Sequence, residues 1–286
     1  MRLLVIGAGG MLGRDVVCRA RQEDHEVVAL ARAELDVTDP DAVGRALAGA
    51  RPDAVVNCAA WTDVDGAESH ANDAYLVNAT AAGSVARAAA AAGARLVHVS
   101  TDYVFDGERP PDAAAYVESD ATGPRSAYGR SKLAGEQLVA EAGDGGLSHA
   151  IVRSSWLFGV AGRNFAATML ALAADRGDVT VVTDQIGCPT YTGHLAEALL
   201  ELAASDAQGV FHVAGAGHCS WHDFAAEIFR QAGTGTGVRP CTTADMPRPA
   251  PRPAFSALAS ERPEAPVLPP WQEGLADYLS KRKVTA

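Results

Sequence analysis

The chain has 286 residues, of which 48 % are hydrophobic and 21 % are charged, a composition typical of a globular protein. Its formal net charge of −11 argues against a nucleic-acid binder, which would carry a basic face. Five scattered cysteines, none in CxxC spacing, favour reduced thiols in a cytoplasmic protein over a disulfide framework or a zinc site. No apolar run is long enough to cross a membrane, and the run after Met1 breaks at Gly7, too soon for a secretory signal.

Short apolar runs alternate with Ala-rich segments through the first half of the chain. The apolar runs predict buried strands at residues 3–6, 26–31, 54–57, 96–100 and 150–153. The segments between them predict helices at residues 11–21, 41–47, 71–92 and 127–141. This alternation predicts an α/β fold with a doubly wound parallel sheet of the Rossmann type. Ligands of such sheets bind at the carboxyl ends of the strands.

Beyond about residue 155 the pattern is looser. We expect helices at residues 164–175, 192–203, 220–232 and 271–283, and strands at residues 179–183 and 210–214. Ser220 and Asp223 resemble a capping box that opens the third of these helices. We therefore expect a dinucleotide-binding domain over residues 1–155, with returning strands and helices within residues 179–235. A smaller α/β substrate-binding domain is expected mainly over residues 156–286.

Residues 239–270 are dense in proline, which disfavours regular helix. We interpret this segment as an ordered or semi-ordered loop of the smaller domain. A PxxP ligand for a partner domain is the alternative.

A glycine turn follows the first predicted strand and opens the first predicted helix. Gly7, Gly10 and Gly13 have GxxGxxG spacing. Glycine permits a tight turn and lets a pyrophosphate approach the backbone, while the helix N-terminus offers free N–H groups to phosphate. We therefore expect this turn to bind a dinucleotide through Gly7, Gly9, Gly10, Met11, Leu12 and Gly13.

The end of the second predicted strand bears on the choice of cofactor. NAD enzymes usually place an acidic residue there, whereas this strand ends at Arg32. A guanidinium can pair with a 2′-phosphate, so NADPH is favoured over NADH. Glu34 lies close by in the sequence, where an acidic residue would favour NADH. A solvated surface position is the alternative for Arg32. Asp36 and Val37 follow as expected contacts of the adenosine.

Tyr128 and Lys132 lie four residues apart in the helix predicted at residues 127–141. This spacing places both side chains on one face, one turn apart. An adjacent ammonium favours the phenolate and should lower the pKa of Tyr128. Tyr128 could then protonate a developing alkoxide, while Lys132 orients the nicotinamide ribose. A surface Tyr/Lys pair is the alternative, but its place after four strands of a dinucleotide fold favours catalysis.

Thr101 follows the fourth predicted strand at its carboxyl end, where its hydroxyl would face the ligand crevice. It could donate a hydrogen bond to a substrate oxygen that gains negative charge. A hydroxyl that closes a local turn is the alternative.

These three features together resemble the extended short-chain dehydrogenase family. Finer matches resemble one branch of it, the dTDP-4-dehydrorhamnose reductases, and occur at residues 57–65, 100–107, 153–159 and 184–190. The resemblance covers nearly the whole chain, and the string at residues 100–107 is specific to this branch.

The resemblance implies reduction of the C4 ketone of a dTDP-linked 4-keto-6-deoxy sugar, most directly dTDP-4-dehydrorhamnose to dTDP-rhamnose. It implies that Tyr128 protonates the oxygen and that Thr101 and Lys132 complete the triad. It also implies cofactor contacts from Ala59, Ala60, Trp61 and Asn78. Implied substrate contacts are Thr62, Val64, Thr101, Asp102, Tyr103, Trp156, Asn164 and Arg252. For Trp156 a core position is the alternative, and for Arg252 a solvated loop position.

This chain also departs from the family's pattern. Trp61 stands where the family has tyrosine, and residues 247–270 are unusually rich in proline. Because that region should face the substrate, a reductase or synthase for another dTDP-deoxysugar, such as a dihydrostreptose-type synthase, remains open.

Proteins of two other functions share the predicted fold. A non-catalytic NADP-binding regulatory subunit is disfavoured by the intact Thr101, Tyr128 and Lys132. Dehydratases usually carry Asp-Glu beside the threonine, whereas Asp102 and Tyr103 follow it here, which favours simple reduction.

Some members of the branch bind Mg²⁺ between subunits through glutamates. We recognise no matching cluster and predict no metal. His218 and His222 lack an evident third ligand, so helix-end and core roles are favoured for them. A homodimer is the candidate assembly.

Overall fold

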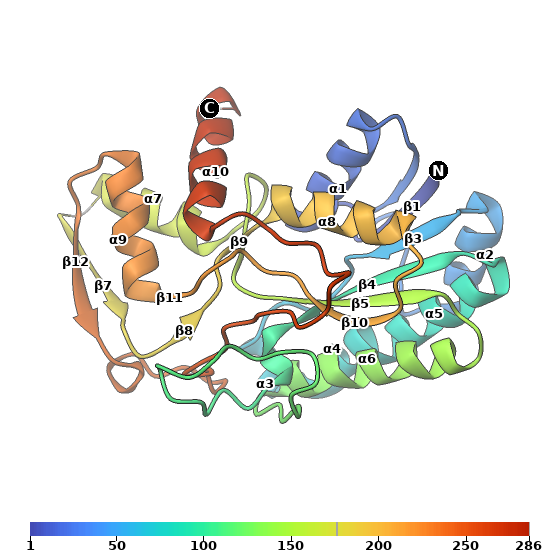
Figure 1. Ribbon diagram of the computed structural model, residues 1–286, viewed down its shortest axis with the longest axis horizontal. Coiled ribbons are helices and arrows are strands. Elements are labelled where there is room, and N and C mark those ends of the chain that lie inside the picture. Colours follow the sequence, from blue (N-terminus) through green and yellow to red (C-terminus); the bar gives the residue numbers. More distant parts are fainter. Residues whose placement is uncertain (176, 286) are drawn as a thin grey trace.

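The structure is a computed structural model that describes residues 1–175 and 177–285. Its centre is a six-stranded sheet in the order β2-β1-β3-β4-β5-β10 (Figure 1), in which every pair of neighbours is parallel. The strands are β1 (Arg2–Ile6), β2 (Glu26–Leu30), β3 (Ala54–Asn57), β4 (Arg95–Thr101), β5 (His149–Ser154) and β10 (Gly209–His212). The strand order reverses between β1 and β3, which creates the crevice where such sheets bind ligands. The predicted fold class is confirmed.

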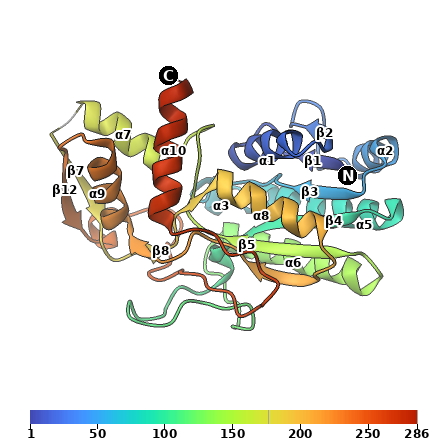
Figure 2. The ribbon, with the colours of Figure 1, turned by 45° about the horizontal axis from the view of Figure 1, so that its top comes forward.

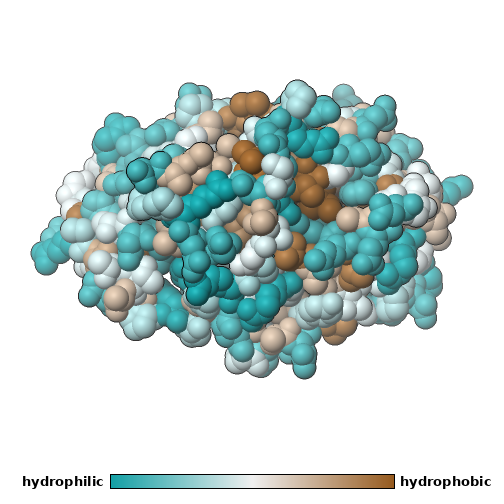
Figure 3. Space-filling view, turned by 60° about the horizontal axis from the view of Figure 1, so that its bottom comes forward, coloured by the Kyte–Doolittle hydropathy of each residue, from teal (hydrophilic) through white to brown (hydrophobic). Residues whose placement is uncertain are grey.

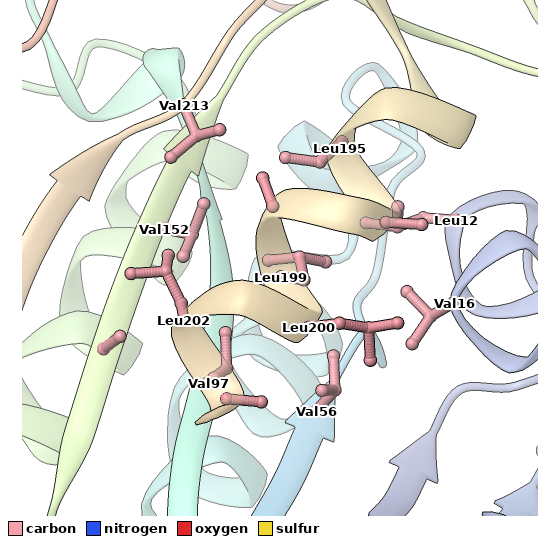
Figure 4. Close-up of a cluster of buried hydrophobic side chains, with 14 of the residues drawn as sticks. Leu12, Val16, Val56, Val97, Val152, Leu195, Leu199, Leu200, Leu202 and Val213 are labelled. Carbon is pink, nitrogen blue, oxygen red and sulfur yellow. The ribbon is translucent and has the colours of Figure 1, made fainter. Parts of the chain in front are cut away.

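Helices cover both faces of this sheet. On one face, α1 (Met11–Gln22) and α8 (Thr192–Ala204) pack side by side. Figure 4 shows Leu12 and Leu199 from these helices meeting Val56 and Val97 from the strands, all buried. The other face is covered by α2 (Pro40–Ala50), α5 (Ala81–Ala92) and α6 (Ala127–Asp144). The sheet is therefore shielded on both sides, and its strands read as continuous apolar runs for that reason.

The helix predicted over residues 71–92 is interrupted. It consists of α4 (Ala71–Tyr75), a π-helical turn η1 (Leu76–Thr80) and α5, and a short helix α3 (Gly66–Ser69) precedes it. Single π turns occur frequently at functional sites. This turn carries Asn78, one of the predicted cofactor contacts.

A second cluster of elements lies beside the carboxyl edge of the sheet. It contains α7 (Phe165–Asp175), α9 (Trp221–Ala232) and α10 (Trp271–Thr285), which gather at one end of the molecule (Figure 2). Three two-stranded pairs complete it: β7 (Asp178–Val182) with β12 (Gly237–Cys241), β8 (Ile186–Gly187) with β11 (Cys219–Ser220), and β6 (Leu157–Phe158) with β9 (Thr190–Tyr191). The capping box of Ser220 and Asp223 at the start of α9 is confirmed. The domain boundaries stay a prediction.

The proline-rich segment begins in β12, which differs from the loop expected there, and beyond residue 241 it is held mainly by other parts of the chain. After a short helical turn η3 (Thr243–Asp245), its backbone bonds to three separate segments. Phe255 donates to Gly107, Ser256 donates to Ile186, and Ala259 donates to Tyr116. Phe255 and Ala257 are fully buried. The segment therefore lies as an ordered strap across the carboxyl end of β4.

The surface is mainly hydrophilic. A space-filling view of one face shows polar side chains over most of it, with apolar groups gathered near the middle (Figure 3). Within residues 1–175 and 177–285, no helix has both the length and the hydropathy that a membrane span requires.

Candidate active site

The glycine turn forms at the first βα junction, as the sequence predicts. Gly7 has φ 78°, and a Cβ there would lie 2.7 Å from the backbone nitrogen of Ala59. A Cβ at Gly13 would lie 2.3 Å from the Gly7 carbonyl oxygen. Both positions therefore require glycine. Gly10 caps α1 without a side-chain acceptor, so the N–H groups that open the helix remain available to an anion.

A cavity of about 740 Å³ opens over this turn. We call it the glycine-turn cavity, and it is lined by residues 7, 9, 10, 31–33, 35–38, 58–61, 73, 76 and 77. These include nine predicted cofactor contacts: Gly7, Gly9, Gly10, Arg32, Asp36, Val37, Ala59, Ala60 and Trp61. Met11, Leu12, Gly13, Asn78, Tyr128 and Lys132 do not line it, and the Leu12 side chain belongs to the hydrophobic core.

The rim of the cavity at the end of β2 carries one exposed cation, Arg32. Glu34 turns back to accept a hydrogen bond from the Ala31 backbone (2.8 Å). Asp36 accepts from both the backbone and the hydroxyl of Thr38, and these bonds, assisted by the charge of Arg32, lower its pKa. Glu34, the carboxylate nearest to Arg32 in the sequence, is thus hydrogen-bonded to the backbone, while the Arg32 side chain is exposed.

Asn78 is buried and uses its amide within the protein. Its Oδ1 accepts from the Trp61 backbone (2.8 Å), and its Nδ2 donates to the Trp61 carbonyl oxygen and to the Ser131 hydroxyl. Ser131 in turn donates to the carbonyl oxygen of Tyr128. Asn78 therefore ties the wall of the glycine-turn cavity to α6, and it does not itself line that cavity.

Tyr128 lies in the first turn of α6. Its ring is 5.5 Å from that of Tyr103 in an edge-to-face arrangement, and it packs against the small apolar cluster of Ala67, Ala74 and Ala127, which Trp61 also contacts. Burial raises the pKa of Tyr128 to about 12, although the hydroxyl of Thr101 opposes this rise. The expectation that Lys132 lowers this pKa is therefore not met, because desolvation of the phenolate dominates.

Lys132 is only 2 % exposed, and its ammonium donates to the carbonyl oxygen of Val99 (2.7 Å). Burial lowers its pKa to about 8, against the opposing charge of Glu136. Glu136, one turn further along α6, forms a buried ion pair with Arg153 (2.7 Å) and accepts from Ser100 (2.5 Å). The sequence reasoning did not identify Glu136. Its position four residues after Lys132 is the one signal in the sequence that places it on the same face of the helix.

Thr101 ends β4 and caps the short turn η2 (Asp102–Val104). Its hydroxyl donates to Asp102 Oδ1 (3.0 Å) and accepts from the Tyr103 backbone (3.2 Å). Both Thr101 and Asp102 are buried. The local turn that the sequence offered as an alternative for Thr101 is thus present, beside the Tyr128 phenol.

A second cavity, of about 560 Å³, lies on the other side of Tyr103. We call it the Arg252 cavity, and it is lined by residues 103, 105–108, 125, 126 and 251–254. Arg252 is fixed there by an ion pair with Asp65 (2.9 Å), and Arg125 pairs with Glu108. Two of the predicted substrate contacts, Tyr103 and Arg252, are thereby brought together.

The other predicted substrate contacts are placed differently. Trp156 has φ 47° and stacks on Trp221 at 3.5 Å, while a Cβ at Gly187 would lie 2.4 Å from its indole. Trp221 therefore covers one face of the indole and Gly187 approaches the same ring closely, while the side chain stays partly exposed, so its role as a platform for a sugar stays a prediction. Asn164 accepts from the Ala167 backbone and so opens α7.

Thr62 is exposed and Val64 is half-buried, and neither lines either cavity. In the same segment, Asp65 is the side chain that reaches the Arg252 cavity wall, and sequence reasoning had not singled it out. Across residues 1–175 and 177–285, no three His, Cys, Asp or Glu side chains gather in a way that could hold a metal ion.

The parallel sheet, its glycine turn and the cavity over its carboxyl edge define a Rossmann-type dinucleotide-binding fold. The chain belongs to the family described as the RmlD substrate binding domain, whose sequence profile matches residues 1–284.

Named relatives span almost the whole chain. A dTDP-4-dehydrorhamnose reductase of Mycobacterium tuberculosis is 46 % identical over 98 % of this chain and 92 % of its own length. A probable dTDP-4,6-dihydroxy-2-methyloxan-3-one 4-ketoreductase of Streptomyces antibioticus is 44 % identical over 97 % of this chain and 94 % of its own. A dTDP-4-dehydrorhamnose reductase of Bacillus anthracis, solved in complex with NADP, has a TM-score of 0.93 at 37 % identity and covers 98 % of this chain and 99 % of that one.

Proposed function

We propose that the protein is an NADPH-dependent reductase of the C4 ketone of a dTDP-linked 4-keto-6-deoxy sugar, with dTDP-4-dehydrorhamnose as its substrate. The position of Tyr128 carries this proposal. The residue packs against Tyr103, which lines the Arg252 cavity, and against the same small apolar cluster as Trp61, which lines the glycine-turn cavity. A proton donor at this point can serve a ligand in each of the two cavities.

The residues around the glycine turn fit a dinucleotide. Gly7, Gly9 and Gly10 line the cavity without side chains, which leaves the close approach to the backbone that a pyrophosphate requires. Arg32 would pair with a 2′-phosphate, and the NADP complex of the Bacillus anthracis relative supports that assignment. When bound, the reduced nicotinamide supplies a hydride.

The side chains beside that position manage the proton. With a pKa of about 12, Tyr128 is protonated at neutral pH and is ready to donate to the alkoxide oxygen. Thr101 supplies a second hydrogen bond to the same oxygen as it gains charge. Lys132 lies one turn further along α6, and we assign its ammonium to the stabilisation of the phenolate that remains after transfer.

The Arg252 cavity suits the nucleotide half of the substrate. Arg252 and Arg125 both line it, and guanidinium groups bind diphosphates in bidentate geometry. Both arginines already have a carboxylate partner, Asp65 and Glu108 respectively. The cavity thus offers two guanidinium groups, and a bound diphosphate would compete with the carboxylates that now pair with them.

A second candidate substrate is another dTDP-linked keto sugar. The Streptomyces antibioticus relative, whose name describes a different dTDP-sugar ketone, supports it. The proline-rich strap that forms one wall of the Arg252 cavity is also the part of this chain that matches the branch most loosely. We propose no resident metal, a cytoplasmic location, and a homodimer as the assembly to be tested by sedimentation.

The test is NADPH oxidation by the purified protein with dTDP-4-dehydrorhamnose, with Tyr128→Phe as the control. We expect oxidation that requires both the sugar and the phenol. Oxidation with another dTDP-keto sugar alone would support the second candidate. Tight NADPH binding without oxidation of any keto sugar would contradict the proposal and favour the regulatory alternative.

A further inference from the structure

A buried carboxyl group follows Thr101 directly. Asp102 is 2 % exposed, and its Oδ1 is bonded to the Thr101 hydroxyl. Its other oxygen, Oδ2, is buried without a hydrogen-bond partner among the residues that the structure describes. The geometry therefore leaves half of a carboxyl group unsatisfied beside a catalytic hydroxyl, and an unsatisfied buried carboxylate is unfavourable when it is ionised.

The groups that face Asp102 are neutral. Tyr103 comes from its own turn, Tyr128 from α6, Cys188 from the loop between β8 and β9, and Ser256 from the strap. The nearest charged groups beyond these are Arg252 and Asp65, which form an ion pair with each other. Their charges influence the pKa of Tyr103 and not that of Asp102. Burial raises the pKa of Asp102 to about 6, with Ser256 and Thr101 opposing the rise.

The direction of one hydrogen bond depends on this proton. Ionised Asp102 can only accept, so it holds the Thr101 hydrogen and leaves that hydroxyl nothing to donate. Neutral Asp102 carries an O–H that can donate to Thr101 Oγ1, and the Thr101 hydrogen is then free to turn toward another acceptor. One of the two Thr101 lone pairs is already used by the Tyr103 backbone, and the other receives this bond.

We propose that Asp102 is a positioning residue that acts through Thr101, and that its neutral form turns the Thr101 hydroxyl toward the keto oxygen of the substrate. The proposal rests on the reductase function proposed above and deepens it. In the neutral form the oxygen meets two donors, Thr101 and Tyr128, and in the ionised form it meets Tyr128 alone. Loss of one such donor lowers kcat by about 10²-fold to 10³-fold.

The activity should fall as the pH rises, because the more active form of the enzyme is the one in which Asp102 is protonated. Below the pKa of Asp102, kcat has its maximum value. Above that pKa, kcat falls about tenfold per pH unit until it reaches the lower rate of the form in which Tyr128 is the only donor. The decline should begin near pH 6 or above, since a substrate that covers the carboxyl group desolvates it further. Lys132, with a pKa of about 8, produces a separate decline at higher pH.

Asp102→Asn is the principal test. The amide is similar in shape, cannot ionise, and can donate to Thr101 as the neutral acid does. We expect the pH profile of kcat for the variant to lose the first decline and to keep the second, whatever the effect of the substitution on KM for the sugar. A variant that shows the wild-type decline, or that loses activity at every pH, would overturn the proposal.

Thr101→Val separates this route from a structural effect. If Asp102 acts through Thr101, adding Asp102→Asn to Thr101→Val leaves the pH profile of kcat unchanged. An equal effect of Asp102→Asn in both backgrounds would contradict the proposal. Ser256→Ala covers the case in which Asp102→Asn does not fold. It removes a polar group near Asp102, and less polar surroundings disfavour the ionised form, so the first decline should move to higher pH, and an unmoved decline would count against Asp102.

Infrared difference spectroscopy gives a readout that does not depend on turnover. A protonated Asp102 contributes a carboxylic C=O band that disappears as the pH rises and is absent in Asp102→Asn. If the band behaves in this way while no keto sugar is reduced, the proposed function fails and the protonation of Asp102 stands. If the sugar is reduced and no such band is found near pH 6, the role of Asp102 fails alone.

Discussion

The two cavities beside Tyr128 are built in different ways. The glycine-turn cavity is walled by the ends of neighbouring parallel strands, where the backbone comes so close that a side chain is excluded at Gly7. The Arg252 cavity is walled by side chains from segments that lie far apart in the sequence, around Tyr103, Arg125 and Arg252. A cavity formed by the backbone suits a part of a ligand that does not vary, such as a pyrophosphate. A cavity formed by side chains can be adapted to a different ligand by a few substitutions.

Tyr128→Phe tests whether the two cavities share one reaction centre. Removal of the hydroxyl should lower kcat by about 10²-fold to 10⁴-fold, because the alkoxide loses its proton donor. NADPH binding, measured by fluorescence, should stay within about twofold, because the phenol does not line the glycine-turn cavity. A comparable loss of NADPH affinity would show that Tyr128 belongs to the cofactor site rather than between the two sites.

Glu136→Gln tests how much the buried ion pair between Glu136 on α6 and Arg153 on β5 contributes to stability. The substitution leaves Arg153 with its charge buried and no carboxylate partner, and breaking a buried pair of this kind lowers the free energy of unfolding by about 3–5 kcal/mol. Urea unfolding measures the change. Glu227→Gln, in the exposed pair with Arg230, is the matched control and should have a much smaller effect. Equal effects of the two substitutions would mean that the pair of Glu136 and Arg153 adds little.

Arg252→Ala should separate the ligands of the two cavities. We expect KM for the sugar nucleotide to rise about 10-fold to 100-fold, because a charged hydrogen bond to the diphosphate is lost, while the Kd for NADPH is unchanged. Arg252→Lys keeps the charge and should recover part of the affinity. An unchanged KM in Arg252→Ala would exclude this residue from the substrate site.

Arg32→Ala is the corresponding change at the glycine-turn cavity. We expect the Kd for NADPH to rise about tenfold and the Kd for NADH to stay constant, since only NADPH carries the 2′-phosphate. Isothermal titration with both cofactors measures this. Equal weakening of both cofactors would show that Arg32 contacts the adenine and does not read the phosphate.

The same contrast explains which features could be predicted from the sequence. The parallel strands, the glycine turn and the Tyr128–Lys132 pair follow from local patterns, because strand burial and helical spacing are properties of short segments. The stack of Trp156 on Trp221 joins residues that are distant in the chain, and no local pattern indicates it. The pKa of Tyr128 was expected to fall, since sequence spacing reveals a neighbouring lysine but does not reveal burial. The split of the helix at residues 71–92 by a π turn was missed because its Ala-rich sequence favours helix throughout.

The proposed role of Asp102 belongs to the same class of feature. Its burial depends on the strap that begins about 150 residues later, so sequence reasoning placed it near the substrate without indicating its protonation. The roles assigned to individual site residues stay predictions until the variants are measured.

Hydride transfer to the sugar tests the central claim most directly. NADPH carrying deuterium at the transferable position would be mixed with enzyme and dTDP-4-dehydrorhamnose in a single turnover, and the product would be analysed by NMR. The account predicts one deuterium at C4 of the sugar in the wild type and, over the same time, none in Tyr128→Phe. Oxidised cofactor without deuterium at C4, or transfer that does not depend on Tyr128, would contradict it.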